Sequence, residues 1–216
     1  MNFNDFIKKF GINIALVDKE QNKELNDFCI ISNSQNIRCE FYGDGRLKSC
    51  AQFINNKING LCIEWFDNGK LMSKIEYKNH KKHGNYLKLY KNGIIFEKAM
   101  YKDGLLNGVY GGCHENTGKP ACKIDYTDGK INGKRISWYE DGILRCEIDY
   151  INGKKQGKSV GWFTNGQKRW EREYAYDQLN GQCTEWYDNG NKKNIIVYKV
   201  GKIISEAKWT INGAKE

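Results

Sequence analysis

Two histidines lie three residues apart in the stretch "YKNHKKHG" (77–84), and imidazoles at this spacing could bind a metal ion or transfer protons. A metal site would need further His, Cys, Asp or Glu ligands at matching spacing, and the sequence offers none beside His80 and His83. Neither histidine has a carboxylate at a spacing suited to acid–base work. We therefore expect neither a metal ion nor an acid–base role here.

A second candidate is the irregular stretch "GVYGGCHENTGKPAC" (108–122), which concentrates Cys113, His114, Glu115 and Cys122. A nucleophile and its base must have converging side chains, but adjacent residues of a strand point to opposite faces. We favour a bulge or bend for this stretch over a reactive site. The chain is therefore predicted not to be an enzyme and to carry no cofactor.

The elements that would position these residues form a repeat. Glycines recur every 24 residues, with one step of 25, in two series: Gly45, Gly69, Gly93, Gly118, Gly142, Gly166 and Gly190, and Gly60, Gly84, Gly108, Gly133, Gly157 and Gly181. Eight residues after each member of the first series stands an aromatic residue: Phe53, Tyr77, Tyr101, Tyr126, Tyr150, Tyr174 and Tyr198. This register indicates an array of about seven units.

Each unit holds two short runs of aromatic and β-branched residues joined by D-N-G, K-N-G, E-D-G or T-N-G, which predicts a β-hairpin. A three-residue loop with glycine in the left-handed position would pair Trp65 with Leu71, Ile63 with Ser73 and Leu61 with Ile75. A two-residue turn would instead place Trp65 on the face of Lys74 and Glu76. We choose the three-residue loop because it gathers Trp, Leu, Ile and Tyr77 on one face.

The opposite face should then be charged and lined with aromatic residues. Its candidate partner-binding residues are Phe66, Lys74, Tyr90, Lys98, Lys123, Tyr139, Arg145, Phe163, Arg169, Tyr187 and Lys193. Such residues could equally pack with cross-strand neighbours and lysine stems.

His80 and His83 each occupy a defined position of this repeat. His80 occupies the position held by Gly104, Gly129 and Gly153 in other units, and by Asn56 and Asp177 in two more. These are the residue types that best tolerate positive φ, so we expect His80 to serve a turn. His83 precedes the second glycine and is expected to be a solvated residue.

Composition and charge limit the possible functions of the chain. The eight cysteines form no C-x-x-C pair, which favours reduced, mostly buried thiols, with disulfides as the alternative. The net charge is +9, although residues 1–33 hold four lysines against five acids, so the repeats carry the basic excess. A basic surface suits nucleic acid, anionic lipid or an acidic protein. With no signal peptide or apolar run of membrane-spanning length, we expect a cytoplasmic protein without a transmembrane segment.

The expected fold class is all-β: an elongated, twisted antiparallel sheet of consecutive hairpins. Residues 1–36 should form an N-terminal cap with a short helix and irregular strands, because Phe3, Phe6, Ile7 and Phe10 have helical spacing. Residues 37–204 form the array, and residues 205–216 a closing strand and tail.

The pattern resembles the MORN repeat, particularly its bacterial variant, and is nearly complete in "GKRISWYEDGILRCEIDYINGKKQG" (133–157). The resemblance implies an elongated sheet of hairpins and a non-enzymatic scaffold or interaction module; many bacterial members are labelled antitoxin components, and eukaryotic members have been linked to membranes and dimerisation. We accordingly expect a non-catalytic module that binds another protein, as an antitoxin, immunity factor or inhibitor. Binding of RNA, DNA or an anionic surface is the alternative, and homodimerisation is a further one.

Overall fold

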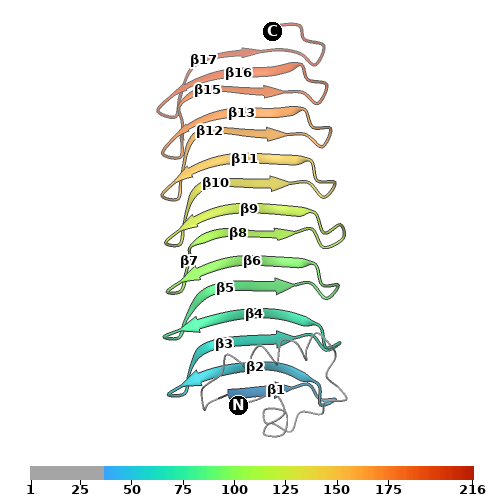
Figure 1. Ribbon diagram of the computed structural model, residues 1–216. Coiled ribbons are helices and arrows are strands. Elements are labelled where there is room, and N and C mark those ends of the chain that lie inside the picture. The colour runs from blue at the N-terminus through green and yellow to red at the C-terminus, as the bar shows by residue number, and fades with distance from the viewer. Residues whose placement is uncertain (1–36) are drawn as a thin grey trace. The chain divides into compact units, whose positions relative to one another are not determined.

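The computed structural model describes residues 37–216, which divide into two compact units, 37–105 and 106–216. The expected cap of residues 1–36 lies outside the described residues. All regular structure in the described part is β, and within each unit the strands pair antiparallel to form successive hairpins, which confirms the expected all-β hairpin repeat (Figure 1). No helix that could cross a membrane occurs in residues 37–216.

The first unit contains β1 (Ile37–Phe41), β2 (Leu47–Ile54), β3 (Lys57–Trp65), β4 (Leu71–Lys78), β5 (Lys81–Leu89) and β6 (Ile95–Lys102). The two-residue strand β7 (Leu105–Leu106) lies where the units meet in the sequence. The second unit contains β8 (Gly108–Cys113), β9 (Pro120–Thr127), β10 (Lys130–Trp138), β11 (Leu144–Ile151), β12 (Lys154–Trp162), β13 (Lys168–Ala175), β14 (Gln178–Leu179), β15 (Gly181–Trp186), β16 (Lys192–Lys199) and β17 (Lys202–Lys208).

The hairpin turns have the predicted form. In the β3–β4 turn, the Phe66 amide donates to the Lys70 carbonyl at 2.8 Å, and the Gly69 amide donates to the Phe66 carbonyl at 3.0 Å. Gly69 has φ 83°, so the turn is type I followed by a left-handed glycine, as expected. The pairing of Trp65 with Leu71 is likewise confirmed.

The predicted register beyond the turn is wrong by one residue. Glu64 pairs with Ser73, so Met72 is an extra residue in β4, and Ile63 lies opposite Lys74 rather than Ser73. The physical reason is a β-bulge, which adds one residue to one strand and reverses the face of every residue beyond it. The same shift follows the turn in the hairpins β10–β11, β12–β13 and β15–β16.

Because of the bulge, the predicted assignment of residues to the two faces of the sheet is wrong. In the first unit, the tryptophan face carries Leu61, Ile63 and Trp65 together with Lys74 and Glu76. The opposite, tyrosine face carries Ser73, Ile75 and Tyr77. In the second unit, the tryptophan face is defined by Trp138, Trp162 and Trp186, and the tyrosine face by Tyr126, Tyr150, Tyr174 and Tyr198. The tryptophans that end the strands and the tyrosines of the repeat thus point to opposite sides of the sheet, not to one apolar side.

The core of the first unit lies on its tryptophan face. Its buried members are Ile37, Leu47, Cys50, Leu61, Ile63, Trp65 and Leu71. A disulfide joins Cys39 to Cys50, which lie opposite each other on β1 and β2. The expectation of reduced thiols is therefore wrong for this pair, because a directly opposed cross-strand pair brings the two sulfur atoms together.

Candidate binding surface

A row of three cation–ring pairs lies on the tyrosine face of the second unit. In each pair, a cationic group lies over the ring of a turn aromatic residue, with distances to the ring centroid of 5.7, 5.6 and 5.8 Å. The pairs, which we call the cation–ring row, are Arg145 over Tyr139, Arg169 over Phe163 and Lys193 over Tyr187.

Two local features of every hairpin build one member of the row. The aromatic residue opens the type I turn and points to the tyrosine face, because it directly follows a tryptophan on the other face. The cation is the extra residue of the bulge, one position past the first residue of the return strand; Arg169, for example, lies between Lys168, opposite Trp162, and Trp170, opposite Gly161. The bulge that overturned the predicted register therefore also brings the cation onto its ring.

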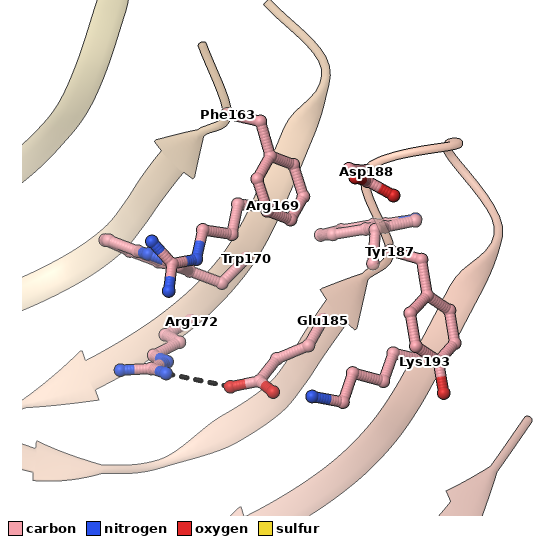
Figure 2. Close-up of a pocket in the computed structure, with 9 residues that line it drawn as sticks. Phe163, Arg169, Trp170, Arg172, Glu185, Tyr187, Asp188 and Lys193 are labelled. Atoms are coloured by element: carbon pink, nitrogen blue, oxygen red, sulfur yellow. Dashed lines mark hydrogen bonds and ion pairs between the residues drawn. The ribbon is translucent and has the colours of Figure 1, made fainter. Parts of the chain in front are cut away.

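Between the second and third members of the row lies a hollow of about 540 Å³. Its lining residues are Phe163, Arg169, Trp170, Arg172, Glu185, Trp186, Tyr187, Asp188 and Lys193. Figure 2 shows Phe163 with Arg169 on one side and Tyr187 with Lys193 on the other, with Glu185 between them and with Trp170 and Arg172 on the Arg169 side. This volume falls in the range of ordinary ligand sites.

An ion pair holds part of the lining in place. Arg172 Nη2 lies 2.8 Å from Glu185 Oε1, across β13 and β15 (Figure 2). Burial works against the charge on Arg172, but its hydrogen bonds to Glu185 and Tyr174 outweigh burial and raise the pKa of the guanidinium. The guanidinium also lies 5.0 Å from the centroid of the Trp170 ring. Arg172 is thus already satisfied within the protein.

The row cations differ from Arg172 in this respect. Arg145, Arg169 and Lys193 are exposed, and none has an acidic partner within the described part of the chain. Each keeps only its ring contact, so its charge is available to a ligand. The rings themselves are half-buried, which leaves one edge or face of each accessible.

The structure divides the eleven candidate residues between two faces. Six of them form the cation–ring row, and Phe66 and Tyr90 open the corresponding turns of the first unit, where Tyr90 packs edge-on against Phe96 at 5.0 Å rather than against a cation. Lys74, Lys98 and Lys123 lie on the tryptophan faces instead, because the bulge precedes them. Lys74 and Lys98 line a separate hollow of about 470 Å³ in the first unit, beside Leu61 and Leu87.

Trp170, Arg172 and Glu185 were missed by the sequence prediction. Trp170 and Glu185 occupy positions whose residue type changes from one hairpin to the next, so the repeat pattern does not mark them, whereas Arg172 stands at a position that most other hairpins fill with isoleucine. One indication was present: Gly161 directly opposes Trp170, and a Cβ at Gly161 would lie 2.3 Å from the indole Cε2. A glycine at a strand position that holds a larger residue in other hairpins shows that a bulky neighbour needs the space.

The three histidines serve the backbone. His80 has φ 64° and its Nδ1 lies 3.0 Å from the Ile58 carbonyl, which confirms its role in a turn. The prediction that His83 is simply solvated is wrong. Its Nδ1 lies 3.4 Å from the Asp103 amide nitrogen and 3.5 Å from the Asp103 carboxylate. The equivalent Asn59 accepts a hydrogen bond from the Asn79 amide in the preceding hairpin. His83 therefore connects one hairpin to the next.

The residues of the irregular stretch 108–122 form a turn and a contact with the next hairpin. Its extra residue lies in the turn, which closes between His114 and Lys119. A register shift follows between Gly112 and Cys113, so the stretch contains the expected bulge, at the place where other hairpins have theirs. His114 Nε2 lies 3.1 Å from the Trp138 carbonyl. Within residues 37–216, no group of three His, Cys, Asp or Glu side chains could hold a metal ion.

An open sheet of hairpins carrying a repeated aromatic turn defines a β-hairpin repeat protein. Four stretches match the family model of the MORN repeat variant: residues 58–79, 82–103, 131–152 and 179–199. The chain thus contains four repeats of the MORN variant. MORN repeats are generally non-catalytic modules, often binding proteins or membranes. No curated protein matches this chain.

Proposed function

We propose that this chain is a non-catalytic protein-binding module that engages its partner through the cation–ring row. The observation that carries this proposal is three exposed, unpaired cations held in line over aromatic rings beside a hollow. Tryptophan, tyrosine and arginine are the residue types that contribute most to binding energy at protein interfaces, and the lining of the hollow combines all three. The partner surface should be acidic, because the row offers positive charge.

A protein partner fits the hollow better than nucleic acid does. Exposed rings among cations could stack on bases, but Glu185 and Asp188 line the same hollow and would repel a phosphate backbone. A protein can offer its acidic groups to the row and neutral groups to these two carboxylates. Antitoxin, immunity factor and inhibitor are forms that such binding would take, and we propose a cytoplasmic setting for it.

Affinity capture with matched variants tests the proposal. The row variant carries Arg145→Gln, Arg169→Gln and Lys193→Gln; the control variant loses the same charge through Lys130→Gln, Lys154→Gln and Lys199→Gln, all exposed on the second unit. A partner captured from the native host by the wild type should be retained by the control variant and lost by the row variant. The captured protein, once purified, should bind directly with the same ranking.

Two outcomes would contradict the proposal. If both variants retain the partner equally, the row is not the binding surface. If the wild type instead captures nucleic acid, with an affinity that falls steeply between low and moderate salt, the alternative function is correct.

A further inference from the structure

The spacing of the cation–ring row defines the conformation of what it can bind. Successive cations lie on β11, β13 and β16, and each step crosses one hairpin. Neighbouring strands lie about 4.8 Å apart, so one hairpin advances the row by about 9.6 Å. A linear ligand running across the strands must therefore present an anionic group about every 9.6 Å on one side.

Only one common peptide conformation meets this spacing. A β-strand presents side chains on one side every two residues, about 6.6 Å, and an α-helix returns to the same side after one turn of about 5.4 Å or two turns of about 10.8 Å. A polyproline II helix has three residues per turn and rises about 3.1 Å per residue, so every third side chain recurs at about 9.3 Å. The mismatch with the row is only about 0.3 Å per step.

The surface between the cations also suits this conformation. Polyproline II segments bind in grooves lined with aromatic residues, where proline rings pack against flat side chains. Between Arg169 and Lys193 lies the hollow, bounded by Phe163 and Tyr187, and Trp170 adds a further aromatic side chain to its lining beside Arg169 (Figure 2). The two residues between successive acids would fall into this space. Such a ligand is already extended and gives up little conformational entropy on binding.

We infer that the cation–ring row binds an acidic polyproline II segment of a partner protein, with Asp or Glu at every third position and small apolar residues such as proline between them. This inference rests on the proposed function and specifies the ligand of the same surface. Three cations match acids at positions i, i+3 and i+6, so a seven-residue core is enough.

Synthetic peptides test the periodicity directly. The probe is a labelled peptide of sequence (Glu-Pro-Pro)₃, and the comparison peptide Glu-Glu-Glu-(Pro)₆ has the same composition but no three-residue period. Fluorescence anisotropy with the full chain should show the periodic peptide binding at least about tenfold more tightly. Each of Arg145→Gln, Arg169→Gln and Lys193→Gln should weaken binding by up to about fivefold, the range of exposed ion pairs.

A charge reversal separates lost recognition from lost folding. The variant with Arg145→Glu, Arg169→Glu and Lys193→Glu should lose the acidic peptide and gain binding to (Lys-Pro-Pro)₃, which the wild type should not bind. A misfolded variant could not show this exchange. Equal binding of the periodic and block peptides, preference for a single-stranded oligouridylate, or absence of the exchange would each overturn the inference.

The failure of this inference differs from failure of the proposed function. If no peptide binds, but capture of a host protein still depends on the row, the surface binds protein and only the polyproline II ligand is wrong. If neither peptide nor captured protein depends on the row, both proposals fail together.

Discussion

His114 Nε2 lies 3.1 Å from the carbonyl oxygen of Trp138, in the place where neighbouring hairpins have a tyrosine hydroxyl. The Tyr139 hydroxyl donates to the Trp162 carbonyl at 2.9 Å, and the Tyr187 hydroxyl donates to the Trp209 carbonyl at 3.1 Å. A carbonyl oxygen can only accept, so His114 Nε2 must carry the proton. The imidazole thus replaces a phenol as the donor that joins one hairpin to the next.

This equivalence predicts the effect of two substitutions. His114→Phe removes the donor and should lower the free energy of unfolding by about 0.5–1.5 kcal/mol, the usual contribution of one hydrogen bond. His114→Tyr should restore most of the loss, because tyrosine is the residue that other hairpins use. Urea denaturation followed by tryptophan fluorescence measures both, and equal stability of the two variants would show that the bond contributes nothing.

Gly161 should not tolerate a side chain while Trp170 is present. Gly161→Ala places a methyl group against the indole, which must then leave its position, and overpacking of this kind costs about 1–3 kcal/mol. Trp170→Ala removes the obstacle, so in the double variant the alanine at position 161 should add little further cost. A double-mutant cycle in urea measures this coupling. Additive effects would mean that the two residues do not compete for space.

The disulfide between Cys39 and Cys50 should stabilise the first unit. Replacing both residues by serine should cost about 2–4 kcal/mol in the free energy of unfolding of residues 37–105. Hydrogen exchange should locate the loss in β1 and β2 and leave β10 to β16 unchanged.

The same bond bears on where the protein resides. Mass spectrometry of protein from the native host, alkylated before lysis, should find the Cys39 and Cys50 peptides linked. Linked peptides would favour an oxidising compartment over the cytoplasm, since cytosolic thiols are kept reduced. Separate, alkylated peptides would support the cytoplasmic prediction.

Cys62 predicts a loss of stability at alkaline pH. Burial, followed by the charges of Glu64 and Glu40, raises the pKa of this thiol from 9.0 to about 11. The folded state therefore holds the thiol proton more tightly than the unfolded state does. Its contribution to stability is complete below pH 9 and is lost as the pH rises toward 11. The wild type should lose more stability across this window than Cys62→Ser, as measured by urea denaturation at each pH. Parallel curves would contradict the burial effect.

The sequence was sufficient to predict the repeat and its turns, but not to predict which side chains share a face of the sheet. Period, turn glycines and the positive φ of His80 follow from residue types whose backbone preferences are strong. The bulge at Met72 is different, because the same position holds Arg145, Arg169 and Lys193 elsewhere and no residue type marks an extra residue in a strand. One unmarked residue was enough to exchange the positions of Lys74 and Tyr77 relative to Trp65.

The candidate surface was predicted in part for the same reason. The turn aromatics Tyr139, Phe163 and Tyr187 follow directly from the repeat. Arg145, Arg169 and Lys193 were placed on the correct face together with cations that belong to the other one, such as Lys98. Trp170 could not be found by periodicity, since a residue that departs from the repeat is invisible to a method that looks for repetition.

Each member of the cation–ring row is built within a single hairpin by a turn and its bulge, and successive hairpins are joined by backbone pairing of their strands and by a hydroxyl or imidazole bond to a carbonyl at the turn. Duplication of one 24-residue segment would therefore add one cation–ring pair without disturbing the pairs already present. If the row binds a linear ligand as proposed, the number of repeats would set the length of that ligand, and recombination between the repeats of the gene would change it by whole units.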